Sequence, residues 1–241
     1  MVYYHLEVKS DNSKTMLSQR QEQLLDRIIV EYVKTAEPVG SQFLVEECKL
    51  DVSPATVRNE MRSLEELGFL THPHTSSGRI PTETGYRYYI EHIMQVDPLA
   101  KKEHDAIRAC FADSDDKQSA VKQTAKYIAE HVSNAVIIAF GQHTLYYTGM
   151  SYLFAQPEFR DVSYMIEASS VFDQFEDRIP YVFDMFASGD TRIFVGSQNP
   201  LGQKTSIIAT RVDDMWYAIL SPLRVDYARA YAFVSDIHSC L

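Results

Sequence analysis

Five polar side chains within residues 53–62 have the types and spacing needed to read DNA: Ser53, Thr56, Arg58, Asn59 and Arg62. An arginine can donate two hydrogen bonds to guanine, and an asparagine can pair in the same way with adenine. The Ser53 hydroxyl and the free amides of a helix N-terminus suit a phosphate oxygen. The alternative is an ordinary solvated helix face, because charged residues are common on protein surfaces. The elements around the segment decide between these two interpretations.

These side chains are expected on one helix. Ser53 is a typical N-cap residue and Pro54 suits the first helical position, so a helix is predicted from Pro54 to about residues 67–68. Its polar face presents the side chains named above, Thr56 included, with Arg58 at the margin. The apolar residues recur at helical spacing and are expected to face a core: Val57, Met61, Leu64 and Leu67.

A second candidate group follows in residues 71–81, a turn-rich stretch that contains no acidic residue. Residues 69–71 and 79–80 have the composition of short strands, so a β-hairpin is predicted here. A loop without carboxylates suits a phosphate backbone, whereas the alternative is an ordinary polar hairpin whose Ser and Gly residues serve the turn. The residues of this hairpin assigned to DNA contact are His74, Thr75, Ser76, Ser77 and Arg79.

The preceding and following residues supply the frame that such a reading helix needs. Ser18 and Gln21 form a capping-box pair before an amphipathic helix that ends near Thr35, and residues 37–41 break the chain before a short second helix that includes Cys48. Thr82 can cap a further helix after the hairpin. Three helices followed by a hairpin predict a winged helix-turn-helix over residues 16–96, with its third helix in the major groove.

The rest of the chain predicts an arm, a connector and a second domain. Residues 1–15 are expected to form an N-terminal arm, with a short strand at residues 2–6, and residues 97–132 a helical connector of two helices. From residue 133 to residue 241, strand-like runs alternate with helical stretches, which is typical of an α+β domain. The expected strands are 135–140, 145–148, 192–195, 205–212 and 215–220, with helices at about 156–186 and 226–238.

Composition restricts the mode of nucleic-acid binding. The 241 residues carry a formal net charge of -10, which argues against a protein that coats nucleic acid through a dense array of cations. Any DNA contact must come from a local basic patch, and the acids of the first domain fall mainly on its first two helices. No run of about 18 apolar residues predicts a membrane span, so a cytoplasmic protein without a membrane partner is expected.

No constellation of residues predicts an enzyme, a cofactor or a metal. The GxSxG, P-loop, HExxH and GxGxxG patterns do not occur. The pair His72-x-His74 lacks a Glu or Cys partner at a recognisable spacing, and Cys110 and Ser163 have no catalytic partner in the pattern. The three cysteines are expected to be reduced thiols, because they form no CxxC pair.

Several segments together resemble a known family. They are Glu37–Ser41, Val52–Met61, Leu64–Gly68, His74–Thr82, Gly85–Arg87, Gln156–Arg160, Asn199-Pro200 and Asp226–Arg229. In order, they resemble the heat-inducible transcription repressor HrcA family over nearly the whole chain. The resemblance implies a repressor of heat-shock (chaperone) operons that binds double-stranded DNA at an inverted-repeat operator as a homodimer. It also implies a GAF-like domain behind the winged helix, and the chaperonin GroEL as a modulator.

One departure from the family concerns dimerisation. The family usually carries an inserted dimerising domain within the GAF-like region, whereas here residues 135–140 pass to residue 145 through only four residues. Four residues suit a hairpin. Dimerisation is then expected to use the GAF-like domain, the connector or the aromatic residues Tyr146, Tyr147 and Tyr152.

Two further alternatives remain open from the residues alone. The overall acidity motivates an alternative class of function, a ligand-sensing or protein-interaction module that uses the winged helix for protein contacts. The group Asp226, Tyr227 and Arg229 suits either a ligand site or a helix cap with a local ion pair, and the cap is the preferred interpretation.

Overall fold

Hydrophobic patterning divides the chain between two separate cores. The computed structural model describes residues 16–47, 52–73, 78–114, 116–141 and 144–240. Contacts within the chain group the described residues up to Gln95 into one unit and those from Val96 onward into another. The two are called the N-terminal unit and the C-terminal unit below, and each is described by itself.

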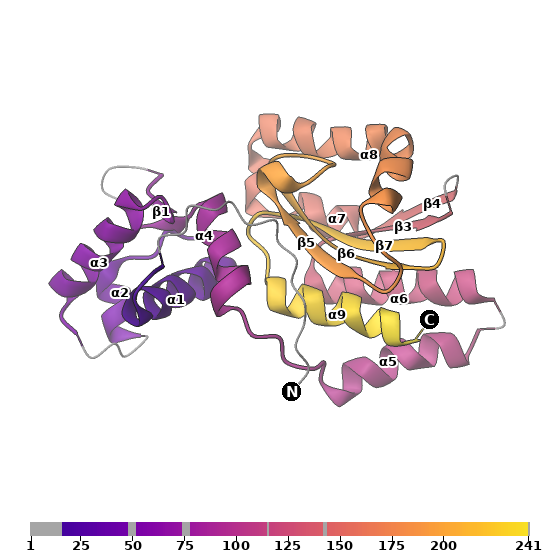
Figure 1. The fold of residues 1–241 in the computed structure, drawn as a ribbon, viewed down its shortest axis with the longest axis horizontal. Helices are drawn as coiled ribbons and strands as arrows, with labels where there is room; N and C mark the ends of the chain where they lie inside the picture. The colour runs from indigo at the N-terminus through magenta and orange to yellow at the C-terminus, as the bar shows by residue number, and fades with distance from the viewer. Residues whose placement is uncertain (1–15, 48–51, 74–77, 115, 142–143, 241) are drawn as a thin grey trace. The chain divides into compact units, whose positions relative to one another are not determined.

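The N-terminal unit is built from short helices and one small strand pair. Its helices and strands are α1 (Gln19–Thr35), α2 (Ser41–Glu46), α3 (Pro54–Glu66), β1 (Leu70–Thr71), β2 (Ile80–Pro81), α4 (Glu83–Tyr88) and a π-helical turn (Tyr89–Ile93). β1 and β2 pair in antiparallel fashion, with Leu70 opposite Pro81. The order of three helices followed by a hairpin matches the sequence prediction for this region (Figure 1).

Local capping signals explain where these helices begin. The Ser18 hydroxyl accepts a hydrogen bond from the Gln21 amide, and the Gln21 side chain accepts one from the Ser18 amide, which confirms the predicted capping box. Ser53 caps α3 in the same manner, and Thr82 caps α4. Behind the caps, Leu25 and Ile28 of α1 are fully buried. The side of α1 that carries them therefore faces the core of the unit.

Two glycines allow the backbone of the N-terminal unit to close around its hairpin. A Cβ atom at Gly78 would lie 2.4 Å from the Val39 carbonyl oxygen, and one at Gly85 would lie 2.2 Å from the Phe69 carbonyl oxygen. Val39 and Arg79 exchange backbone hydrogen bonds of 2.9 Å in both directions, so the turn before α2 joins the hairpin as a third extended segment. Backbone contacts this close leave no room for a side chain at either glycine.

The C-terminal unit is an α+β fold around an antiparallel sheet. Its strands lie in the order β4-β3-β7-β6-β5, and the labels follow this order across Figure 1. The strands are β3 (Ala135–Phe140), β4 (Thr144–Thr148), β5 (Thr191–Val195), β6 (Thr205–Val212) and β7 (Met215–Pro222). The helices are α5 (Lys101–Ala112), α6 (Lys117–Val132), α7 (Met150–Phe154), α8 (Val162–Asp184) and α9 (Tyr227–Cys240), with 3₁₀ turns at Pro157–Arg160 and Gly196–Gln198.

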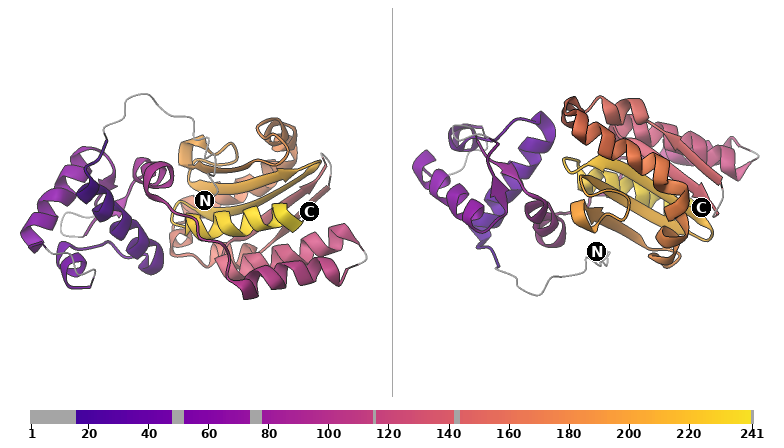
Figure 2. Two further views of the ribbon diagram at one scale, coloured as in Figure 1. Left: turned by 60° about the horizontal axis from the view of Figure 1, so that its bottom comes forward. Right: turned by 90° about the horizontal axis from the view of Figure 1, so that it is seen from above.

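Helices cover both faces of this sheet. α8 crosses one face, and α6 and α9 lie against the other, with α5 packed outside them (Figures 1 and 2). Ile137 of β3 and Trp216 of β7 point toward α8, where Trp216 packs between Phe175 and Phe186. Because both faces are covered, the central strands are buried along their length, which explains their nearly continuous apolar runs.

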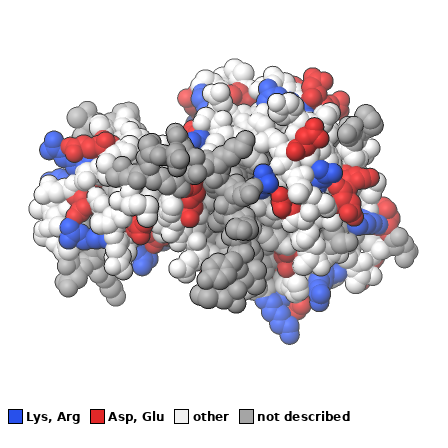
Figure 3. All heavy atoms as spheres, in the orientation of Figure 1, with Lys and Arg blue, Asp and Glu red and all other residues white. Residues whose placement is uncertain are grey.

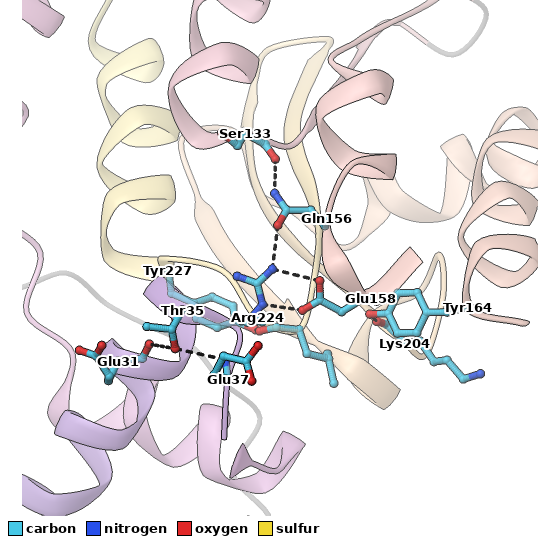
Figure 4. Close-up of polar contacts among 11 residues, drawn as sticks. Glu31, Thr35, Glu37, Ser133, Gln156, Glu158, Tyr164, Lys204, Arg224 and Tyr227 are labelled. Atoms are coloured by element: carbon cyan, nitrogen blue, oxygen red, sulfur yellow. Dashed lines mark hydrogen bonds and ion pairs between the residues drawn. The ribbon is translucent and has the colours of Figure 1, made fainter. Parts of the chain in front are cut away.

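A buried arginine joins three segments at one end of the C-terminal unit. The Arg224 guanidinium donates to both carboxylate oxygens of Glu158, at 2.5 and 3.0 Å, and to the Gln156 side-chain oxygen at 2.7 Å (Figure 4). The Gln156 amide in turn donates to the Ser133 carbonyl at 2.7 Å. The Arg224 side chain is only 9% exposed. Every group in this network has a partner within the unit, so the network is an internal brace.

Most sequence predictions for the elements are confirmed, and the differences have local causes. The strands 135–140 and 205–212 have the predicted bounds. Leu67 was expected in the core but is 40% exposed, because α3 ends at Glu66 and the chain turns at Gly68, whose φ is 81°. The helical stretches predicted over residues 156–186 are a 3₁₀ turn followed by α8, which Asp161 caps, and α7 was not predicted. The expected strand at residues 2–6 and Cys48 lie outside the described residues.

The cap interpretation of Asp226 is also confirmed. Its carboxylate accepts a hydrogen bond from the Arg229 amide at 3.0 Å, and the Arg229 guanidinium pairs with Glu103 of α5 at 2.7 Å. The Tyr227 hydroxyl is buried and donates to the Leu223 carbonyl at 2.7 Å.

In the described part of the chain, no helix is both long and apolar enough to cross a membrane.

The substitution Gly85→Ala tests the close contact between α4 and β1. We expect it to lower the free energy of unfolding of the N-terminal unit by roughly 1–3 kcal/mol, because the added methyl group meets the Phe69 carbonyl and outweighs the better helix propensity of alanine. Urea denaturation followed by circular dichroism measures the change. Gly40→Ala is the control, since no atom lies within 4 Å of its added Cβ. Equal stability of the two variants contradicts the contact.

Candidate DNA interface

α3 presents a polar face opposite its buried side. Val57, Met61 and Leu64 are buried, as predicted, and this fixes the orientation of the helix. Arg58, Asn59 and Arg62 are all exposed, as expected for the predicted reading face. The remaining candidate, Thr56, is only partly exposed. The structure thus places Arg58 on the open face and Thr56 at its margin, which reverses their predicted positions.

Thr56 lies at the margin because it takes part in the helix cap. The Thr56 amide donates to the Ser53 hydroxyl oxygen at 3.1 Å, and the two hydroxyl oxygens lie 2.9 Å apart. The two hydroxyl groups therefore hydrogen-bond to each other, and the Ser53 hydroxyl also satisfies one of the free amides in the first turn of α3. Ser53 remains exposed at the helix N-terminus, where the helix dipole favours an anion.

The exposed side chains of the face differ in their intramolecular partners. Within the described residues, the structure gives Arg58 and Asn59 no ion pair or side-chain hydrogen bond. Arg62 pairs with Glu66 one turn later at 3.0 Å, with the two side chains 75% and 65% exposed. A pair this exposed contributes little energy, so Arg62 can exchange Glu66 for another acceptor at small cost.

Arg79 has a different environment from the arginines on α3. Its guanidinium pairs with the Glu65 carboxylate of α3 at 2.7 Å and donates a second hydrogen bond from Nε at 2.9 Å. His72 of the hairpin also contacts Glu65 through Nδ1. Glu65 thus joins both ends of the hairpin to the third helix. The other hairpin candidates, residues 74–77, lie outside the described residues.

Glu65 is the group that the sequence interpretation missed. It is separated by 14 residues from Arg79, so no helical or strand spacing indicates the contact. Burial alone raises the pKa of the Glu65 carboxyl, but hydrogen bonds from His72 and Arg79 and the charge of Arg79 together lower it below its ordinary value. The carboxylate is therefore stabilised in its charged form by the hairpin residues.

The carboxylates of the N-terminal unit, expected mainly on its first two helices, also occur on α3. Besides Glu65 and Glu66, Glu60 of α3 pairs with Arg20 of α1. On the face drawn in Figure 3, basic and acidic side chains lie beside one another over the N-terminal unit. The arginines Arg20, Arg62, Arg79 and Arg87 of this unit each pair with a carboxylate, whereas Arg58 has no ion pair within the described residues.

A family model described as "HrcA protein C terminal domain" matches residues 96–230. The chain belongs to the HrcA family. This confirms the resemblance inferred from the sequence motifs.

Two curated relatives of this HrcA-family chain are both named "Heat-inducible transcription repressor HrcA". The protein from Cutibacterium acnes is 44% identical over 125 residues, which cover 52% of this chain and 37% of the relative. The protein from Chloroflexus aggregans is 55% identical over 95 residues, which cover 39% of this chain and 25% of the relative. The matches therefore span well under half the length of these relatives.

A solved structure supports the fold of the HrcA-family chain. The structure titled "Crystal structure of a hypothetical protein at 2.2 A resolution" superposes with a TM-score of 0.71. It covers 93% of this chain and 97% of the other chain at 16% sequence identity. At this identity the likeness shows the fold alone, a mixed helix and sheet architecture that fits a GAF-like domain in the C-terminal unit.

Glu65→Gln tests the link between α3 and the hairpin through its pH dependence. Because the pKa of Glu65 is lowered in the folded state, its charge contributes stability above the ordinary carboxyl pKa, and this contribution is lost as the pH falls through the folded value. We expect Glu65→Gln to be less stable than the parent at pH 7, with the difference vanishing in acid, as measured by urea denaturation. Glu66→Gln is the matched control and should change stability little at any pH. A pH-independent loss in Glu65→Gln contradicts the assignment.

Proposed function

We propose that this chain is a DNA-binding transcriptional repressor whose residues 16–96 form a winged helix-turn-helix. The exposed group Arg58, Asn59 and Arg62 on α3 carries the proposal. These side chains stand on a helix whose other side is buried and whose N-terminus is capped, so they are presented outward on a rigid element. Membership of the HrcA family and the repressor names of the relatives support the same function.

In this proposal, the parts of the N-terminal unit have separate roles. α3 enters the major groove, where Arg58, Asn59 and Arg62 contact base edges. Ser53 and Thr56 lie at the phosphate nearest the helix N-terminus. The hairpin is the wing, and its residues 74–77 with Arg79 contact the backbone. Such phosphate contacts hold the protein on DNA without selecting a sequence.

The resemblance to the HrcA family also supports a proposal for the target and the assembly. We propose that the operator is an inverted repeat before heat-shock (chaperone) genes, that it is bound by a homodimer, and that the chaperonin GroEL modulates the repressor. Residues 97–132 then connect the reading unit to a GAF-like domain over residues 133–241. A two-fold symmetric protein matches the symmetry of an inverted repeat, because each reading helix meets the same half-site.

Alanine substitutions on α3 test the reading face. We expect Arg58→Ala, Asn59→Ala and Arg62→Ala each to weaken binding to the cognate inverted repeat by about 1–3 kcal/mol, with much smaller effects on unrelated DNA. Fluorescence anisotropy at fixed ionic strength measures both affinities. Arg160→Ala is the matched control, because Arg160 is an exposed arginine of the C-terminal unit. If all three α3 variants keep full specificity, the winged helix serves another purpose, such as contacts with protein.

Arg79→Ala separates a phosphate contact from a purely internal ion pair. If Arg79 contacts phosphate, its loss weakens binding to all sequences and lowers the slope of log affinity against log salt by about 1. If Arg79 only holds Glu65, the slope stays unchanged. Glu65→Gln is the control, since it breaks the same ion pair but leaves the arginine in place. We expect a reduced slope in Arg79→Ala and an unreduced one in Glu65→Gln.

A further inference from the structure

The two edge strands of the sheet in the C-terminal unit differ in how they are protected. β4 and β5 have no strand partner on their outer sides within the described residues. β5 carries Arg192, which pairs with Asp190 at 2.9 Å, and a charge on an edge strand discourages pairing with another chain. β4 reads Thr144-Leu145-Tyr146-Tyr147-Thr148 and has no charged residue, proline or glycine. Its composition strongly favours strand pairing.

The sequence of β4 is self-complementary about Tyr146. When two antiparallel copies are related by a two-fold axis at Tyr146, Thr144 of one copy lies opposite Thr148 of the other. Leu145 then lies opposite Tyr147, and Tyr146 lies opposite its own copy. The register thus gives Thr–Thr and Tyr–Tyr pairs of like side chains and two Leu–Tyr pairs of apolar ones, and aromatic and Thr–Thr pairs are among those that stabilise antiparallel strands.

The two faces of β4 agree with this register. Leu145 and Tyr147 pack against the core beneath α8, and the Tyr147 ring meets Phe172 edge-on at 5.6 Å. Tyr146 points to the other face, where the Lys122 ammonium of α6 lies 5.5 Å from its ring centre. In the register above, residues that share a face in one copy share it in the pair. A shift by one residue places Leu145 opposite Tyr146 of the second copy, on the wrong face.

We propose that β4 is the dimerisation surface of this chain, where a second copy pairs its own β4 in antiparallel register about Tyr146 and makes one continuous sheet. The inference deepens the homodimer of the proposed function and rests on it for its biological role. The partner that fits β4 is a second copy of the chain. The partner strand must be uncharged and must present matching side chains when it runs antiparallel to β4, and β4 itself meets both conditions. The resulting contact is isologous, as a two-fold dimer requires.

The expected affinity is modest. Five residues of strand bury less surface than the roughly 800 Å² per partner of a stable interface, so a dissociation constant on the order of micromolar is expected for the free protein. Two half-sites on one operator hold two copies close together, which raises their effective concentration. The strand pair therefore forms most completely on DNA that carries both half-sites.

Charged substitutions in β4 test the register. The double variant Thr144→Lys/Thr148→Lys places lysine opposite lysine at both ends of the paired strands, and Thr144→Glu/Thr148→Glu does the same with carboxylates. We expect the dimer dissociation constant of each variant, measured by sedimentation velocity, to be at least tenfold higher than that of the parent. A mixture of the two is expected to regain dimers, because each lysine then lies opposite a glutamate. Thr191→Lys/Gln203→Lys adds two lysines at β5 and the loop before β6 and is expected to dimerise as the parent does.

The outcomes separate this inference from the proposed function. A parent that stays monomeric at about 100 µM, a lysine variant of unchanged dimer affinity, or no recovery in the mixture overturns the strand pairing. Circular dichroism confirms that each variant is folded. Binding to a DNA duplex with a single half-site is measured on the same samples, and the β4 variants are expected to retain it. If the parent itself does not bind the half-site duplex, the proposed function is overturned, and the result on strand pairing still stands.

Discussion

Arg79 is held at two points, and the geometry of the N-terminal unit depends on both. Its backbone exchanges hydrogen bonds with Val39, and its guanidinium pairs with Glu65 of α3. The first contact fixes the base of the hairpin against the turn before α2, and Gly78 lets the chains approach closely enough to make it. The second fixes the hairpin against the third helix. One residue thereby sets the position of the proposed wing relative to the proposed reading helix.

The C-terminal unit satisfies a different constraint. Its sheet is covered by helices on both faces, so its apolar strands are removed from water and only the two edges remain for pairing. The edge at β5 carries a charge, whereas the edge at β4 does not. In this fold the surface available to a second strand is thus decided by a few residues at one margin of the sheet. The Arg224 brace, by contrast, is committed to internal contacts.

Local signals made much of this structure predictable. The caps at Ser18 and Ser53 depend on residues three positions apart, and the strand 135–140 is a continuous apolar run, so each is visible in the sequence. The exposed face of α3 was predictable for the same reason, since helical spacing places Asn59 and Arg62 opposite the buried residues. Long-range contacts were not predictable. The pairing of Glu65 with Arg79 joins residues on different elements, and the exposure of Leu67 depends on where the chain turns after the helix.

The single tryptophan of the chain has a practical consequence. Trp216 is 1% exposed and packs between Phe175 and Phe186 beneath α8, within the C-terminal unit. Its fluorescence therefore senses the packing of α8 on the sheet, whereas the N-terminal unit contributes only tyrosine emission. The chain thus contains an intrinsic optical probe for one of its two units, and the melting of that unit can be followed separately without any added label.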